Sequence, residues 1–221
     1  MDSLERLSTE VAVCRKCPRL VEWREMVARE KRAGFRDWVY WGRPLPGFGD
    51  PEARLMAVGL APAAHGGNRT GRIFTGDRSG DWLYRALFKA GYANQPTSTS
   101  RDDGLRLKGA YVSAAVRCVP PDNKPTREER DNCLPYLVRE IDLLASLRVI
   151  VPLGGFAYDA VSLAVGLRHR PHFGHGAEAA LPRGQTILCS YHPSQRNTFT
   201  SMLTEEMFDA IFRRATELMW G

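Results

Sequence analysis

Four short, nearly continuous apolar segments, separated by helical patterns, constrain this sequence more than any other feature. They cover residues 53–60, 110–116, 148–154 and 186–191. Short segments that are apolar throughout are typical of parallel strands, because helices cover both faces of a parallel sheet. Strands that alternate with helices therefore predict a doubly wound α/β fold, in which a parallel sheet lies between two layers of helices.

Helix start signals occur between these segments. Ser79 is expected to N-cap one helix, and Thr126 opens a second one in a capping box. Pro135 lies inside the second helix and is expected to kink or divide it, because proline lacks the backbone N–H that a helix interior needs. Two more helices are expected after Gly155 and from Thr204.

Length and charge narrow the class of protein. The chain has 221 residues, enough for a single domain over residues 1–221 with a full core. No apolar stretch approaches the roughly 20 residues of a membrane span, and the charged N-terminus lacks the apolar centre of a signal peptide. We therefore expect a cytoplasmic protein with no membrane partner. Lys and Arg outnumber Asp and Glu by 31 to 25, and the formal charge of +6 suits a polyanion partner without requiring one.

The chemically rich segments all follow predicted strands. They are the first loop, GLAPAAHGGNRTGRIFTGD (59–77), the second loop, RCVPPDNKPT (117–126), and the third loop, HPSQRNT (192–198). Ligands bind beyond the carboxyl ends of the strands in doubly wound sheets, so these loops are expected to meet at one edge as an active site. The first loop contains neither a P-loop pattern nor a G-x-G-x-x-G that opens a helix, which argues against a nucleotide-binding loop.

Four of the five cysteines are candidate metal ligands. Cys14 and Cys17 form a C-x-x-C pair, whereas Cys118 and Cys133 are more widely spaced. Thiolates suit zinc or an iron–sulfur cluster. The wide second pair favours a cluster that clamps the N-terminus onto the sheet edge, with zinc and unliganded buried thiols as the alternatives. Cys189 lies in a predicted strand, where a free cysteine behaves as a small core residue.

Three histidines recur in the tract RHRPHFGHG, at His169, His172 and His175. Such a tract can bind metal, but the proline and glycine within it favour exposed or hydrogen-bonded histidines. Cys189 and His192 are close enough in sequence to suggest a thiol nucleophile with its base. No nucleophile elbow accompanies them, so a core role for Cys189 is the stronger interpretation.

Three segments and four cysteines, in this order, carry a resemblance to a known family. The segments are the first loop, the second loop and SYHPSQRNTFTSMLTEEM, which contains the third loop. Together they closely resemble the uracil-DNA glycosylase superfamily, and within it the type 5 branch. The resemblance extends from Cys14 to about Met207. It implies a three-layer α/β/α sandwich with a central four-stranded parallel sheet. It also implies a structural [4Fe–4S] cluster that ties down the N-terminal segment 1–50. The implied cluster ligands are Cys14, Cys17, Cys118 and Cys133.

The resemblance implies roles for individual residues as well. Phe74 would stack on a base flipped out of the DNA, and Asn123 would hydrogen-bond the base edge. His192 would donate to the uracil carbonyl on which negative charge grows. Gly59 and Ala61 would complete the base site. The residues implied to contact the DNA backbone, or to fill the gap left by the extruded nucleotide, are Pro62, His65, Ser194, Arg196 and Asn197.

One position departs from the family pattern. Other branches carry an acid or amide near the start of the first loop, where this chain has Leu60 and Ala61. Asp77, at the end of the same loop, is therefore the candidate that stabilises a cationic sugar or orients water, with His192 as the second catalytic residue. The alternative is that Asp77 only favours the start of the following helix.

Taken with the resemblance, the sequence predicts a monofunctional, monomeric DNA glycosylase. It would hydrolyse the N-glycosidic bond of uracil in DNA and initiate base excision repair. The apolar first loop has few groups that reject other bases, so removal of deaminated bases such as hypoxanthine is a further hypothesis. The alternatives are a catalytically weak module that binds damaged DNA and keeps its metal cluster for structure, and a zinc-dependent nucleotide hydrolase.

Overall fold

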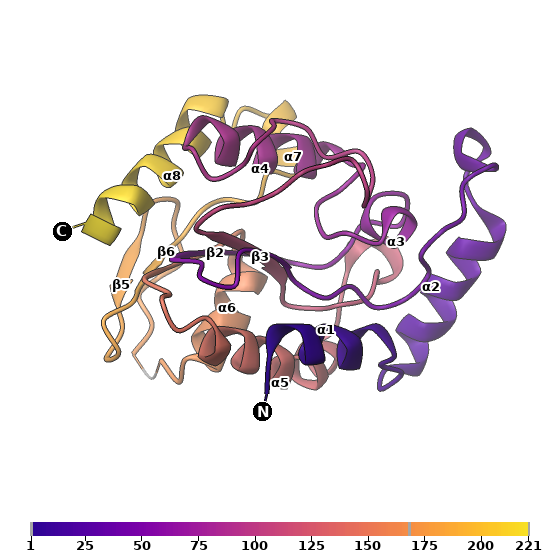
Figure 1. The fold of residues 1–221 in the computed structure, drawn as a ribbon, viewed down its shortest axis with the longest axis horizontal. Coiled ribbons are helices and arrows are strands. Elements are labelled where there is room, and N and C mark those ends of the chain that lie inside the picture. The colour runs from indigo at the N-terminus through magenta and orange to yellow at the C-terminus, as the bar shows by residue number, and fades with distance from the viewer. Residues whose placement is uncertain (1, 168, 221) are drawn as a thin grey trace.

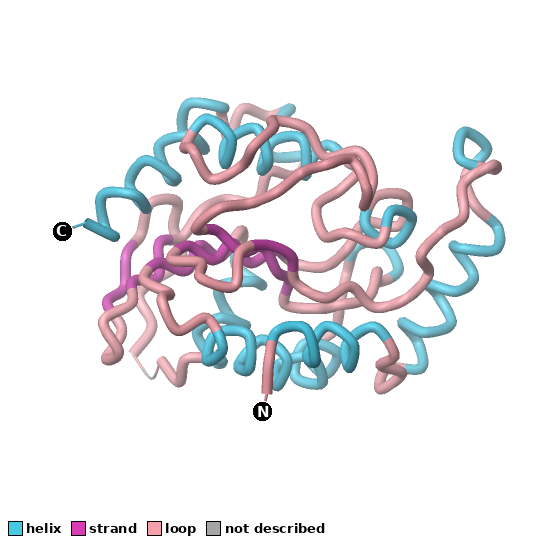
Figure 2. Tube along the Cα trace, viewed as in Figure 1, coloured by secondary structure: helices cyan, strands magenta, loops and turns pink. Residues whose placement is uncertain are grey.

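A mixed sheet forms the centre of the fold in a computed structural model that describes residues 2–167 and 169–220. Within these residues the strand order is β1-β3-β2-β4-β6-β5 (Figure 2). β2 pairs in parallel with β3 and β4, and β4 pairs in parallel with β6, which confirms the four predicted parallel strands. The strands are β1 (Phe48–Gly49), β2 (Leu55–Gly59), β3 (Ala110–Ala114), β4 (Val149–Pro152), β5 (Glu178–Ala180) and β6 (Thr186–Leu188).

Two antiparallel edge strands extend the sheet beyond the predicted four. β1 pairs with β3 at one edge, and β5 pairs with β6 at the other. The predicted four-stranded parallel sheet therefore forms the centre of a larger mixed sheet. β1 is two residues long, and β5 has an exposed Glu-Ala-Ala sequence, so neither carries the apolar run that marks a buried strand.

Helices cover both faces of the sheet, as the three-layer prediction requires. In Figure 1, α4 and α8 lie on one side of the strands, and α1, α5 and α6 lie on the other. These helices are α1 (Leu4–Ala12), α4 (Arg78–Lys89), α5 (Arg127–Leu143), α6 (Gly155–Ala164) and α8 (Glu205–Trp220). The shorter or peripheral ones are α2 (Pro18–Glu30), η1 (Ala33–Phe35), α3 (Gly67–Thr70), η2 (Pro121–Asn123) and α7 (Gln195–Phe199).

The central strand β2 separates two apolar cores. Leu55 and Ala57 pack in the core on the α4 and α8 side, whereas Met56 and Val58 pack in the core beneath α5 and α6. All four are buried, which explains why the strand reads as a continuous apolar run rather than an alternating one. Among the residues that the structure describes, no helix is both long and apolar enough to cross a membrane.

α5 begins at the predicted capping box. The Thr126 hydroxyl accepts from the Glu129 N–H at 3.2 Å, and the Glu129 carboxylate accepts from the Thr126 N–H at 2.8 Å. Pro135 does not divide the helix, which runs unbroken to its end. Pro135 and Asp131 are both exposed, so water can satisfy the Asp131 carbonyl that loses its helical partner.

The start of α4 differs from its prediction by two residues. The N-cap is Asp77 rather than Ser79, and its Oδ1 accepts from the Gly80 N–H at 3.0 Å. Aspartate and serine are about equally good N-caps, so the sequence pattern alone did not separate them. The shift matters because Asp77 closes the first loop.

Candidate active site and cysteine cluster

A pocket of about 560 Å³ opens at the carboxyl ends of the parallel strands. Its walls come from the loops after β2, β3, β4 and β6, which the doubly wound topology brings to one edge. The volume lies in the usual range of small-molecule sites, roughly 300–1,000 Å³. The predicted site residues on its walls are Ala61, Pro62, Phe74, Asp77, Asn123, His192, Ser194 and Arg196.

Phe74 forms one wall of the pocket in a constrained backbone conformation. Its φ of 51° is rare for a non-glycine residue, so the surrounding structure has to hold it. The ring packs over Gly59 at the end of β2, where a Cβ atom would lie 2.5 Å from two ring carbons. Gly59 is not among the residues that line the pocket. It contributes to the site by leaving space for Phe74.

We expect Gly59→Ala to displace the Phe74 ring and to lower the free energy of unfolding by about 1–3 kcal/mol, because the added methyl group overpacks the contact. Urea denaturation measures this change. Gly174→Ala is the matched control, since a Cβ at Gly174 would meet nothing within 4 Å. Equal stability of the two variants would show that Gly59 does not support Phe74.

His192 lies across from Phe74, with ring centroids 6.0 Å apart and ring planes inclined by 29°. Burial lowers the pKa of the His192 imidazole to about 4, so the ring is neutral at physiological pH. Neither ring nitrogen has a hydrogen-bond partner within the described part of the chain. A neutral imidazole still offers one N–H donor to a ligand in the pocket.

The third loop fixes the backbone at His192. The His192 carbonyl accepts from the Ser194 N–H at 2.8 Å and from the Asn197 side-chain amide at 2.9 Å. The Ser194 hydroxyl accepts from the Asn197 N–H at 3.3 Å and N-caps α7. The amide nitrogen of Asn197 is bonded inside its own loop, and the residue is not on the pocket wall. Its contact with DNA stays a prediction.

Asn123 reaches the pocket from a left-handed turn at the end of η2. The turn holds Asp122 at φ 53° and Asn123 at φ 56°, a region that asparagine and aspartate tolerate better than other non-glycine residues. The Asn123 side chain is exposed and makes no hydrogen bond to the described residues. Its amide is therefore free to pair with a ligand.

Asp77 lines the pocket and caps α4 at the same time. Burial raises the pKa of the Asp77 carboxyl above its ordinary value, although the N–H groups at the start of α4 act in the opposite direction. One carboxylate oxygen accepts the capping hydrogen bond from Gly80. The Asp77 side chain can therefore face the pocket and cap α4 from the same position, so the catalytic and the helix-start interpretations do not exclude each other.

His65 is not among the residues that line the pocket, and its contact with DNA stays a prediction. Its Nδ1 shares a hydrogen bond of 3.0 Å with the Tyr40 hydroxyl, and its ring centroid is 6.4 Å from that of Phe35. Burial lowers the pKa of His65, helped by the positive charges of Arg32 and Arg69. His65 thus contacts the segment after α2.

The loop after β4 contributes site residues that were not predicted from the sequence. Leu153, Gly154, Gly155 and Phe156 all line the pocket. Gly154 has φ 93°, and a Cβ there would lie 3.3 Å from the His192 Cβ, so glycine permits the close approach of the two loops. The signal that could have found this loop is the Gly-Gly pair at the end of a predicted parallel strand.

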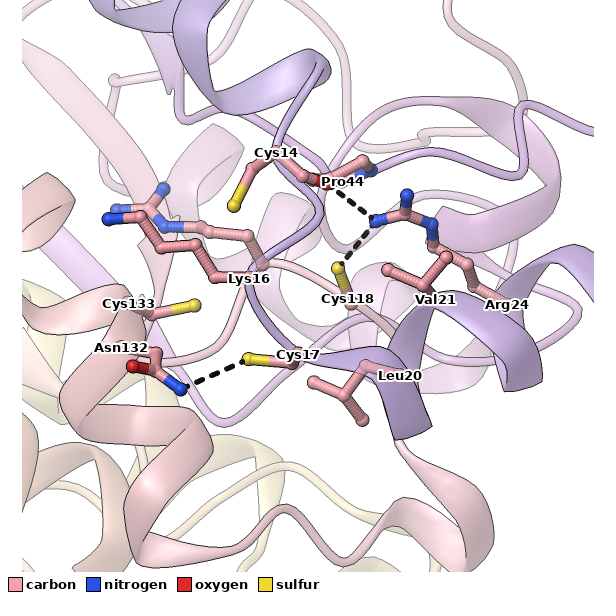
Figure 3. Close-up of a pocket in the computed structure, with 11 residues that line it drawn as sticks. Cys14, Lys16, Cys17, Leu20, Val21, Arg24, Pro44, Cys118, Asn132 and Cys133 are labelled. Atoms are coloured by element: carbon pink, nitrogen blue, oxygen red, sulfur yellow. Dashed lines mark hydrogen bonds between the residues drawn. The ribbon is translucent and has the colours of Figure 1, made fainter.

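The four predicted metal-binding cysteines come together from distant parts of the chain. Cys14 and Cys17 precede α2, Cys118 follows β3, and Cys133 lies in α5. Figure 3 shows their sulfur atoms directed into one space. No group of three or more His, Cys, Asp or Glu side chains among the described residues has the arrangement for a single metal ion. All four cysteines line one small pocket.

The contacts of Arg24 favour a negatively charged group among the four cysteines. The side chain is buried, and its Nη1 donates to the Cys118 sulfur at 3.0 Å and to the Cys14 carbonyl at 3.3 Å. Its carboxylate neighbour is Glu25, at 3.7 Å. Burying a guanidinium is costly unless negative charge lies close by, and metal-bound thiolates would supply it. Burial raises the pKa of the Cys118 thiol to about 12, although the charge of Arg24 and its hydrogen bond act in the opposite direction.

α2 connects the cysteines to two of the pocket loops. The Arg24 carbonyl accepts from the Asn68 side-chain amide of the first loop at 3.2 Å. Arg19 donates to the Lys124 carbonyl of the second loop at 3.2 Å and pairs with Glu129. The cysteine cluster and the pocket therefore share structural supports.

The remaining histidines and Cys189 have structural surroundings. His175 accepts from the Tyr191 N–H at 3.2 Å and lies 3.3 Å from the Met207 carbonyl, whereas His169 and His172 are exposed. Burial raises the pKa of the Cys189 thiol to about 12, which argues against a nucleophilic thiolate. The predicted core role of Cys189 is confirmed.

Comparisons with known proteins agree with this geometry. A family model described as the uracil DNA glycosylase superfamily matches residues 46–216. The chain is 52% identical over 219 residues to a type-5 uracil-DNA glycosylase of Mycobacterium leprae, covering 98% of this chain and 96% of the relative. It is 53% identical over 209 residues to a type-5 enzyme of Thermus thermophilus, covering 94% of each chain. A type-4 uracil-DNA glycosylase of Sulfurisphaera tokodaii is 30% identical over 155 residues, covering 70% of this chain and 56% of the relative.

Proposed function

The chain belongs to the uracil DNA glycosylase superfamily, and on this basis we propose that it hydrolyses the N-glycosidic bond of uracil in DNA. The products are free uracil and an abasic site, the first intermediate of base excision repair. The observation that carries this proposal is the common pocket of Phe74, Asn123 and His192 at the carboxyl edge of the sheet.

Each of these three groups answers one requirement of the reaction. A base inside a duplex is inaccessible, so it has to leave the stack, and an aromatic face and an amide replace its lost partners. Phe74 supplies the face and Asn123 supplies the amide. Uracil departs as an anion, and the neutral His192 donates to the carbonyl oxygen on which that charge grows.

Asp77, which lines the same pocket, is proposed to act on the sugar side of the breaking bond. As the base leaves, the sugar acquires oxocarbenium character, which a carboxylate stabilises and which water attacks. Leu60 and Ala61, on the same wall, offer no acid or amide for either task. Their apolar character also supports the hypothesis that hypoxanthine enters the pocket.

Asp77→Asn separates the two roles of this residue, because asparagine caps a helix about as well as aspartate does. We expect the variant to keep its melting temperature, to bind abasic DNA normally and to release uracil about tenfold more slowly, the equivalent of about 1.4 kcal/mol. Asp77→Ala is expected to lose about 1 kcal/mol of stability in addition. Wild-type kinetics for Asp77→Asn would leave only the capping role.

The four cysteines are proposed to hold a structural [4Fe–4S] cluster. Cys14 and Cys17 bind it from the N-terminal segment, and Cys118 and Cys133 bind it from the sheet edge and α5. When bound, the cluster supplies folding free energy rather than reaction chemistry. Arg24 donates to the Cys118 sulfur, and its carbonyl accepts from the Asn68 side-chain amide. The second contact fixes the first loop against α2. Zinc is the less favoured occupant.

A uracil-containing duplex tests the proposed function. Incubation followed by alkali is expected to break the strand at the uracil, and omission of alkali is expected to leave it intact, because a monofunctional glycosylase does not cut the backbone. Duplexes with hypoxanthine and thymine measure base selectivity. Alkali-resistant strands, with a control enzyme active on the same DNA, would contradict the proposal.

A catalytically weak damage-binding module is the second candidate function. The observation in its favour is the apolar pair Leu60 and Ala61, where other branches of the superfamily carry an acid or amide. Tight binding to abasic DNA without release of any base would favour this candidate.

A further inference from the structure

The arm, residues 31–40, follows α2 and lies at the edge of the molecule beyond the sheet (purple, right side of Figure 1). It carries one almost fully exposed and one partly exposed apolar side chain. Val39 is 91% exposed and Trp38 is 38% exposed. Apolar side chains that gather on a projecting segment mark a contact surface.

The arm is fixed on the first loop. The Arg69 guanidinium lies 4.1 Å from the centroid of Phe35 and 4.1 Å from that of Trp38, a double cation–π contact. The Tyr40 hydroxyl hydrogen-bonds His65 of the same loop. A surface held in this way loses little conformational freedom when a partner binds.

Arg69 also places the arm near the pocket. Its Nη2 donates to the Gly76 carbonyl at 3.2 Å, and its Nε donates to the His65 carbonyl at 2.7 Å. Gly76 immediately precedes Asp77 on the pocket wall. The first loop therefore connects the arm to the pocket.

The arm and the last residues of α2 before it carry mainly positive charge. The basic residues are Arg29, Lys31, Arg32 and Arg36, and the acidic ones are Glu30 and Asp37. Lys31 is bonded to the Arg36 carbonyl at 3.0 Å. Arg32 and Arg36 are exposed and form no ion pair within the described residues. The arm therefore combines two guanidinium groups that form no ion pair in the described residues with exposed apolar side chains. This combination suits a polyanion that has apolar surface between its charged groups.

We propose that the arm is a second DNA-contact element that holds the duplex beside the flipped nucleotide. Arg32 and Arg36 contact phosphates, while Trp38 and Val39 pack against sugars or an opened base step in the minor groove. The proposal rests on the proposed function, because it takes duplex DNA as the occupant. The unpaired arginines and the adjoining pocket favour DNA over a protein partner.

Val39→Ser tests the apolar contact. Val39 is almost fully exposed, so the variant is expected to fold normally and to weaken binding of an abasic duplex about 3- to 10-fold, as expected for lost apolar burial. Fluorescence anisotropy measures this Kd. Leu163→Ser is the matched control, because Leu163 is 44% exposed on α6, away from the arm.

The double variant Arg32→Gln/Arg36→Gln tests the phosphate contacts. Each lost contact lowers the slope of log Kd against log salt concentration by about one, so the double variant is expected to lower it by about two. The control is Arg213→Gln, an exposed arginine on α8.

These binding measurements test whether the arm contacts DNA, and they do not depend on uracil release. A wild-type protein that releases no uracil contradicts the proposed function, and the Kd values still decide the role of the arm. Wild-type Kd and salt slope in Val39→Ser and in the double arginine variant would overturn the arm proposal, even with full glycosylase activity.

Discussion

His192→Ala is expected to release uracil from DNA about 100-fold more slowly than the wild-type protein under single-turnover conditions. The variant loses the donor that faces the developing negative charge, and removal of one such donor in other enzymes costs about 10²–10³-fold in rate. The neutral ring has no other hydrogen-bond partner among the described residues, so its N–H is available for this role. His172→Ala, at an exposed histidine, is expected to keep the wild-type rate.

The low pKa of His192 gives the same prediction a pH dependence. With a folded-state pKa of about 4, the imidazole stays neutral between about pH 6 and 8, so its donation causes no inflection in the rate there. The unfolded chain takes up this proton near the ordinary value of about 6.5. The stability that His192 contributes is therefore present above about pH 6.5 and is lost as the pH falls toward 4. An NMR titration that places the pKa near 6.5 would contradict this account.

Cys118→Ser is expected to lose most of its iron and the absorbance near ~400 nm that a cluster produces. The free energy of unfolding is expected to fall by several kcal/mol, because the metal-binding free energy is folding free energy. The buried Arg24 would also be left beside a neutral hydroxyl instead of a thiolate. Iron analysis and urea denaturation measure the two effects.

Cys189→Ala is the matched control for the cluster. Cys189 is also buried, but it lies in the core next to β6 and away from the other four cysteines. We expect this variant to keep its iron. An iron content in Cys118→Ser equal to that of Cys189→Ala would contradict the assignment of Cys118 as a ligand, and zinc in place of iron would favour the alternative metal.

Loss of the cluster is expected to slow uracil release as well. The contact from Arg24 to Asn68 reaches the first loop, and the contact from Arg19 to Lys124 reaches the second. Both contacts start from α2, which follows Cys17 directly. A cluster bound by the cysteines would thus act on the pocket through the position of α2.

The central layers of the fold could be predicted because local patterns report them directly. The four parallel strands are apolar throughout, since both of their faces are buried, and Thr126 with Glu129 announces the start of α5. The pocket followed from topology, because the loops after parallel strands share one edge. Phe74, Asn123 and His192 follow from the resemblance, and the fold brings them to one pocket.

The rest depends on tertiary contacts that leave little trace in the sequence. β1 and β5 form because a neighbouring strand offers unpaired backbone groups, not because of their own side chains. Gly59 was expected to contact the base, but its position under Phe74 appears only when the first loop folds back over β2. The Asn197 side chain donates to the His192 carbonyl, a contact that likewise exists only once the third loop has folded.

A crystal structure of the protein with a duplex that carries 2′-fluorinated deoxyuridine tests the central claim most directly. The fluorine disfavours the cationic sugar, so the base stays attached while it occupies its site. We predict that the uracil ring lies outside the helix against Phe74, with its polar edge hydrogen-bonded to Asn123 and His192. A uracil that stays stacked in the duplex, or that is bound at a place none of these three side chains touches, would contradict the account.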